Sequence, residues 1–155
     1  MRVDKVFEFF INNNLTLSTV ESITGGKLSS SIIKKAGAST FFKGSLVTYS
    51  NEAKIHILNI DKEKINQFSA VSKKISIEMA KSGKEILNSD YCISTTGNAG
   101  PLTNDDYSKV GHVFVSIATP DKILSKEFYL KGSREEIFEI VVEKSLEFLL
   151  ENLTG

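Results

Sequence analysis

Ser22 lies in a turn, Ser22-Ile23-Thr24-Gly25-Gly26, whose residue types could present a hydroxyl group for chemistry. The turn follows a short apolar segment at 15–20 and precedes a helix-like pattern at about 25–35, so we expect the serine at the edge of a sheet. The two glycines let a second group approach the backbone closely. The first amides of a helix have no intrahelical partners. The turn therefore predicts a site for a phosphate or another anion, or for a carbonyl oxygen.

A serine hydroxyl is a poor nucleophile unless a base removes its proton during the attack. The usual histidine base is hard to find, because His112 lies in a predicted strand and His56 on a predicted helix. Lys54 is the better candidate, since burial can lower the pKa of a lysine towards neutrality. A serine–lysine pair is an established variant of nucleophilic acyl transfer.

Three loops that follow predicted strands supply the candidate side chains, at residues 22–26, 49–54 and 96–101. In open α/β sheets, ligands bind beyond the carboxyl ends of the strands. Convergence of the loops would assemble one pocket from Ser22, Thr24, Tyr49, Lys54 and Thr96. A simpler interpretation makes Ser22 or Thr24 a helix cap and Lys54 a solvated surface lysine. Residue chemistry alone favours this simpler interpretation.

The composition is that of an ordinary globular protein and excludes several classes of function. With 155 residues, 41% hydrophobic and 25% charged, the chain suits one domain with a proper core. Nineteen basic residues balance nineteen acidic ones, so no global field would attract nucleic acid or an anionic membrane. No apolar run approaches the roughly 18 residues of a membrane span, and the N-terminal residues do not form a secretory signal.

Cysteine and histidine usage points to a reducing compartment and to chemistry without a metal. Cys92 is the single cysteine and cannot form an internal disulfide. His56 and His112 lack metal-ligand spacing, so no metal is predicted. We therefore expect a cytoplasmic protein with no membrane or nucleic-acid partner.

Hydrophobic periodicity defines the elements that must position these residues. Helices are predicted at about 3–11, 25–35, 72–88 and 137–149. Asn51 and Asp61 are predicted to cap two short helical turns, and Ser133 to Glu136 to form a capping box. Strands are predicted at 15–20, 41–50, 90–95, 110–118 and 123–130, the last two as a hairpin. The order of elements predicts one three-layer α/β/α domain, residues 1–155, with a mixed sheet.

Five motifs occur in a diagnostic order: VESITGG, GSLVTYSNEAK, TTGNAGP, KVG and GSREEI. This order resembles the CinA C-terminal-domain family, the nicotinamide-nucleotide amidohydrolases, from about residue 4 to 150. The resemblance implies hydrolysis of the carboxamide of nicotinamide mononucleotide, giving nicotinic acid mononucleotide and ammonia, in pyridine-nucleotide recycling. It implies no metal or organic cofactor. The family often carries an N-terminal pyrophosphatase-type domain. Because the 155 residues contain no such domain, the chain is expected to represent the stand-alone amidohydrolase form.

The resemblance also implies roles for individual residues. Ser22 matches the family's nucleophile, Lys54 its general base, and Tyr49 and Thr96 the positions that complete the catalytic site. The substrate-binding positions implied are Thr24, Gly25, Gly26, Gly97, Gly100 and Arg134. Backbone amides near Thr24 to Gly26 are expected to hold the oxyanion. Because the family tends to self-associate, a homo-oligomer is expected.

One departure from the family concerns the loop after the third motif. The family usually continues into further glycines, whereas this chain has Leu102-Thr103-Asn104-Asp105-Asp106. Two carboxylates facing inward would disfavour a phosphorylated substrate. Two alternative functions stay open: a nucleotide- or partner-binding module of the same fold, and an amidase for another small carboxamide. Direct action on DNA has little support from a net charge of zero.

Overall fold

Five strands form one open sheet in the computed structural model, which describes residues 2–106 and 108–153. The strands are β1 (Leu17–Glu21), β2 (Phe42–Val47), β3 (Tyr91–Gly97), β4 (His112–Ala118) and β5 (Ile123–Tyr129). Their order across the sheet is β2-β1-β3-β4-β5. β1 pairs in parallel with β2 and β3, whereas β3–β4 and β4–β5 are antiparallel. The predicted mixed sheet is confirmed.

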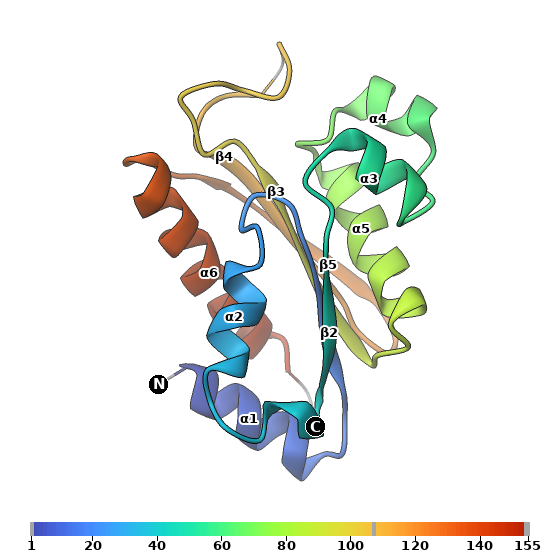
Figure 1. Cartoon of the computed structure of the whole chain (residues 1–155), viewed down its shortest axis with the longest axis vertical. Helices are drawn as coiled ribbons and strands as arrows, with labels where there is room; N and C mark the ends of the chain where they lie inside the picture. The colour runs from blue at the N-terminus through green and yellow to red at the C-terminus, as the bar shows by residue number, and fades with distance from the viewer. Residues whose placement is uncertain (1, 107, 154–155) are drawn as a thin grey trace.

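Helices cover both faces of this sheet (Figure 1). One face carries α1 (Arg2–Asn12), α2 (Lys27–Ile33) and α6 (Arg134–Glu151). The other face carries α3 (Asn51–His56), α4 (Lys62–Phe68) and α5 (Lys73–Ile86). A 3-10 turn, η1 (Ala38–Thr40), precedes β2. The predicted three-layer α/β/α arrangement is confirmed.

The three parallel strands end at the same edge of the sheet. In the register of the sheet, Glu21 at the end of β1 lies beside Val47 of β2 and Thr95 of β3. All five residues of β1 are buried, as expected for a central strand covered on both faces. The loops after these strands therefore start at one level, which is where open α/β sheets bind their ligands.

Aromatic side chains form the centre of the core beneath α1, α2 and α6. Phe10 stacks on Phe41 with ring centroids 5.5 Å apart, and Tyr91 meets Phe10 edge-on at 5.2 Å. Phe7 contacts Phe41 edge-on at 4.8 Å. Aromatic pairs in such geometries add about 1 kcal/mol each beyond the burial of their area. These contacts fix α1 against the sheet.

The opposite core, beneath α5, depends on a close approach between helix and sheet. A Cβ atom on Gly83 would lie 2.1 Å from Val20 Cγ2 and 2.8 Å from Cys92 Sγ. Cys92 is fully buried. The Ser76 and Ser116 hydroxyl groups share a buried hydrogen bond of 2.6 Å under the same helix. Only glycine at position 83 allows this spacing.

Helix caps agree with the sequence patterns at two positions and differ at one. Asp61 accepts a hydrogen bond from the amide of Glu63, and Ser133 with Glu136 forms the predicted capping box. The prediction that Asn51 caps α3 is wrong. Ser50 is the cap, and its hydroxyl accepts from the amide of Ala53, because the helix begins one residue earlier than its sequence pattern suggests.

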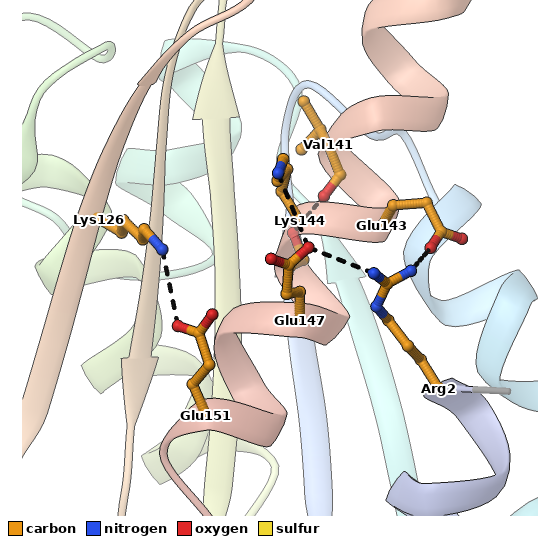
Figure 2. Close-up of polar contacts among 8 residues, drawn as sticks. Arg2, Lys126, Val141, Glu143, Lys144, Glu147 and Glu151 are labelled. Carbon is orange, nitrogen blue, oxygen red and sulfur yellow. Dashed lines mark hydrogen bonds and ion pairs between the residues drawn. The ribbon is translucent and has the colours of Figure 1, made fainter.

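Ion pairs on the surface join the first and last helices (Figure 2). Arg2 bridges Glu143 and Glu147 of α6, with N–O distances of 2.5 and 3.4 Å, and Lys126 of β5 lies 3.6 Å from Glu151. Exposed pairs of this kind contribute at most about 1 kcal/mol each. No helix in the described part of the chain is long and apolar enough to cross a membrane.

Candidate active site

Ser22 and Lys54 are in direct contact at the carboxyl edge of the parallel strands. Lys54 Nζ lies 3.0 Å from Ser22 Oγ. Ser22 follows β1, and its backbone amide donates to the carbonyl of Thr95 in β3, which fixes the start of the turn. Lys54 comes from α3, and only 1% of the residue is exposed. The structure thus brings together the two side chains that were predicted to act as nucleophile and base.

Two backbone carbonyls orient the amine of Lys54. Nζ lies 2.9 Å from the carbonyl oxygen of Thr48 and 3.5 Å from that of Tyr49. Burial lowers the pKa of Lys54 from 10.5 to about 8, because a charged amine is poorly solvated there. About a tenth of Lys54 is therefore neutral at pH 7, far more than for a lysine with a pKa of 10.5. The interpretation of Lys54 as a solvated surface residue is wrong.

The turn after Ser22 is held by a buried carboxylate, that of Glu21. Glu21 is completely buried, and its Oε1 accepts from the amides of Gly26 at 3.2 Å and Leu28 at 2.9 Å. Its Oε2 accepts from the amide of Ser29 at 3.0 Å and from the hydroxyl of Ser45 at 3.1 Å. The expectation that the first amides of α2 lack partners is wrong, because Glu21 occupies the position predicted for an external anion.

Only part of the turn remains available to a ligand. The amide of Gly25 donates to the carbonyl of Ser22 at 3.2 Å. Thr24 is buried, and its hydroxyl donates to Glu21 at 2.6 Å. The amides of Ile23 and Thr24 have no acceptor among the described residues. These two amides directly follow the serine, the usual place for an oxyanion site beside a nucleophile.

The Ser22 hydroxyl lies at the wall of a cavity of about 320 Å³. The cavity is lined by Ser22, Ile23, Tyr49, Gly97, Asn98, Ala99, Leu102, Thr103, Asn104, Arg134 and Phe138. Among the described residues that line it, Arg134 is the only one with a charged side chain, and none is a carboxylate. A larger cavity of about 430 Å³ lies between the end of α5 and the β4–β5 turn, but it contains no pair of nucleophile and base.

Arg134 links three parts of the cavity wall. Its Nη1 donates to the carbonyl of Gly100 at 2.7 Å, and its Nη2 donates to the Tyr49 hydroxyl at 3.2 Å. Its guanidinium carbon lies 5.0 Å from the ring centroid of Phe138. Three residues named from the resemblance, Tyr49, Gly100 and Arg134, are therefore in one connected group. Tyr49 is itself 63% exposed, at the mouth of the cavity.

Thr96 and Gly97 occupy different environments at the end of β3. Thr96 is buried, and its hydroxyl donates to the carbonyl of Ala70 at 2.8 Å. It is not among the residues that line the cavity. Gly97 does line it, and a Cβ atom there would lie 2.8 Å from the carbonyl oxygen of His112. Thr96 therefore lies behind the described cavity wall, with its hydroxyl bound to Ala70, whereas Gly97 forms part of the wall.

The loop at 101–106 turns its half-buried carboxylate, that of Asp105, towards neighbouring serines and not into the cavity. Asp105 accepts from the amide and hydroxyl of Ser108 at 2.7 and 2.9 Å, and from the hydroxyl of Ser69. Asp106 is exposed and does not line the cavity. Asn98 organises the same loop, with Oδ1 accepting from the amide of Asn104 at 2.9 Å. The carboxylates that would have disfavoured a phosphorylated substrate do not face inward.

Sequence reasoning missed Glu21, Asn98 and Phe138. One feature of the sequence could have indicated the role of Glu21: it is an acidic residue at the end of an apolar strand, immediately before a glycine-containing turn. In the described residues, no group of three or more histidine, cysteine, aspartate or glutamate side chains could hold a metal ion.

The fold and the site together define a class of protein: an open mixed α/β domain with a buried serine–lysine pair at the carboxyl edge of its parallel strands. The family model for the CinA C-terminal domain matches residues 2–153. The chain belongs to the CinA C-terminal domain family, and the resemblance seen in the motifs is confirmed.

Curated relatives of the chain are about three times as long as the region that matches. A CinA-like protein of Flavobacterium psychrophilum is 42% identical over 139 residues, which are 90% of this chain and 33% of the relative. A CinA-like protein of Fervidobacterium nodosum is 44% identical over 134 residues, 86% of this chain and 33% of the relative. The chain thus spans about a third of the length of these relatives.

Solved structures share the whole fold. The competence or damage-inducible protein of Enterobacter asburiae superposes with a TM-score of 0.95 at 32% identity, covering 99% of this chain and 96% of that chain. The competence damage-inducible protein A of Klebsiella pneumoniae gives a TM-score of 0.94 at 28% identity, covering 97% and 94%.

Proposed function

We propose that this domain hydrolyses the carboxamide of nicotinamide mononucleotide to nicotinic acid mononucleotide and ammonia, with Ser22 as nucleophile and Lys54 as general base. The observation that carries the proposal is the 3.0 Å contact between Lys54 Nζ and Ser22 Oγ at the wall of a cavity. The choice of nucleotide comes from the order of the sequence motifs. The geometry supports the reaction type.

The hydrogen bonds of Lys54 support its role as base. A neutral amine has two N–H donors and one lone pair, and the carbonyls of Thr48 and Tyr49 accept the two donors. The lone pair is then left for the proton of Ser22. As Oγ attacks the carboxamide carbon, this proton passes to Nζ, and the resulting ammonium acquires a third N–H. That third N–H faces the reacting centre.

The same proton completes the reaction. Lys54 transfers it to the amide nitrogen, the C–N bond breaks, and ammonia leaves an acyl ester on Ser22. Water then attacks the ester carbon while Lys54 accepts one of its protons. The ester bond breaks, Ser22 regains a proton from Lys54, and the carboxylic acid product loses its remaining proton to ammonia in solution and departs as a carboxylate. Electrons and protons balance without any further reactant.

The amides of Ile23 and Thr24 are the best-placed donors for the oxyanion. They have no acceptor among the described residues and directly follow the nucleophile. A well-aimed donor of this kind lowers the barrier by about 3 kcal/mol. Glu21 already holds the Gly26 amide, so the proposed oxyanion site lies nearer to Ser22 than the sequence suggested.

The remaining predicted residues have supporting roles in this proposal. Arg134 retains unused N–H groups after binding Gly100 and Tyr49, so it is available to an anionic group of the substrate. Tyr49 holds Arg134 at the cavity mouth through its hydroxyl. Thr96 has a positioning role, because the hydrogen bond from its hydroxyl to the carbonyl of Ala70 anchors the end of β3 to the segment between α4 and α5.

Ammonia release from nicotinamide mononucleotide by the purified protein tests the proposal. We expect Ser22→Ala and Lys54→Met to lower kcat by at least about 10³-fold, while both variants keep the far-UV circular dichroism of the folded protein. Ser30→Ala and Lys62→Ala, at exposed positions of the same residue types, are matched controls and should keep full activity. Nucleotide binding without any ammonia over hours would instead establish the non-catalytic alternative.

A further inference from the structure

We infer that Lys27 is a second cation of the substrate site, which together with Arg134 binds a dianionic phosphate monoester beside Phe138. The inference rests on the proposed function, because it names the group by which the substrate would be held. Lys27 belongs to none of the sequence motifs, and no role was predicted for it.

Phe138 brings the two cations together at the wall of the cavity. Its ring lines the same cavity as Ser22. Lys27 Nζ lies 5.4 Å from the ring centroid, and the guanidinium carbon of Arg134 lies 5.0 Å from it. Contacts of this type hold a cation over a ring with about 0.5–1 kcal/mol at exposed sites. Both cations therefore lie beside the same ring of the cavity wall, although Lys27 itself is not among the residues that line the cavity.

Both cations occupy positions that are unfavourable for the folded chain alone. Lys27 is the first residue of α2, and Arg134 is the first residue of α6. A positive charge in the first turn opposes the helix dipole, at a cost of a few tenths of a kcal/mol or more. A bound anion would offset this cost by pairing with the two cations.

The described part of the protein supplies no ion-pair partner for either cation. Among the described residues, neither Lys27 nor Arg134 forms an ion pair. No aspartate or glutamate lines the cavity, and Asp105 is turned towards Ser69 and Ser108. Two uncompensated positive charges beside one cavity favour a ligand group with close to two negative charges.

A phosphate monoester has the required charge and donor count. At pH 7 it carries about −1.5 to −2 and three acceptor oxygens. Arg134 uses two of its five N–H donors, on Gly100 and Tyr49. Lys27 has three donors and no acceptor among the described residues. A carboxylate, with one charge, would leave one of the cations without a partner.

The experiment compares Lys27→Met with Lys34→Met, since Lys34 is also exposed and lies at the other end of α2. The measured quantity is the ratio of kcat/KM for nicotinamide mononucleotide to that for nicotinamide riboside, which lacks the phosphate. We expect this ratio to fall on the order of fivefold in Lys27→Met, the effect of one solvent-exposed charge contact. Lys34→Met should leave the ratio unchanged.

The result that overturns the inference is an equal ratio in the wild type and Lys27→Met, or an equal fall in both variants. If the wild type releases ammonia from neither substrate, the proposed function fails and the inference is tested by calorimetric titration with nicotinamide mononucleotide. Weaker binding to Lys27→Met than to Lys34→Met would then support the phosphate site. Equal binding to both variants would reject it.

Discussion

Replacement of Lys54 by methionine separates the chemistry of the site from the stability of the fold. The pKa of Lys54 is 10.5 in its ordinary state and about 8 in the folded protein, because burial penalises the charged form. Well below pH 8 the lysine is protonated in both the folded and the unfolded protein, so the folded protein bears the full free-energy cost of burying the charged amine. As the pH rises from about 8 towards 10.5, the unfolded chain keeps its proton and the folded protein does not. Stability therefore increases with pH.

The magnitude follows from the two pKa values. Each pKa unit is worth about 1.36 kcal/mol, so the gap between 10.5 and about 8 corresponds to about 3 kcal/mol. About 2.5 kcal/mol of this change is expected between pH 7 and pH 10. Lys54→Met has no titrating group at the site. The free energy of unfolding of the wild type should therefore rise by about 2.5 kcal/mol relative to the variant over this range.

Urea unfolding at pH 7, 8, 9 and 10 measures this difference. The chain contains no tryptophan, so far-UV circular dichroism is the suitable signal. Other titrating groups change equally in the two proteins and cancel, as do the pH-independent losses of the hydrogen bonds to Thr48 and Tyr49. A difference that stays constant from pH 7 to 10 would refute the reasoning, because Lys54 would then titrate as an ordinary lysine and could not serve as base.

Three further outcomes are expected. The kcat/KM for amide hydrolysis should fall about tenfold per pH unit below about pH 8 and level off above it, because only neutral Lys54 accepts the proton. Gly83→Ala should destabilise the fold by about 3 kcal/mol in urea unfolding, because its Cβ would lie 2.1 Å from Val20. Glu21→Gln should cost at least about 3 kcal/mol, since either orientation of the amide group faces a backbone N–H.

Neighbouring substitutions provide the controls for the two stability predictions. Ser82→Ala, one residue before Gly83 on the same helix, should stay within about 0.5 kcal/mol of the wild type. Ser45→Ala removes one of the hydrogen bonds to Glu21 and should cost about 1–2 kcal/mol. A Glu21→Gln variant as stable as Ser45→Ala would show that the backbone amides of α2 do not depend on the carboxylate.

The sequence predicted the architecture well because the fold follows local patterns. Period-two segments and amphipathic stripes identified the strands and helices. The parallel ends of β1, β2 and β3 then placed three loops at one edge, as the observed register shows. The motif order identified the family. The contact between Ser22 and Lys54 agrees with that order, although residue chemistry alone had favoured a helix cap and a surface lysine.

The features that could not be predicted depend on contacts between distant segments. Glu21 is buried because Ser45 of β2 and Ser29 of α2 surround its carboxylate, and nothing local distinguishes it from a solvent-exposed residue. Strand alternation puts Thr95 and Thr96 on opposite faces of β3. The register of the sheet decides which of these two threonines points towards α2. In the structure it is Thr95, whose hydroxyl reaches that of Thr24.

The side-by-side arrangement of α1 and α6 affects how this domain could be joined to other protein segments. The start of α1 and the end of α6 lie towards the end of the sheet opposite to the loops that follow β1 and β3 (Figure 1). A domain fused at either terminus would start at the far end of the molecule, and a short linker would keep it clear of the cavity mouth. Fusion partners, affinity tags and surface-immobilisation anchors placed at either terminus should therefore leave the entrance beside Tyr49 open.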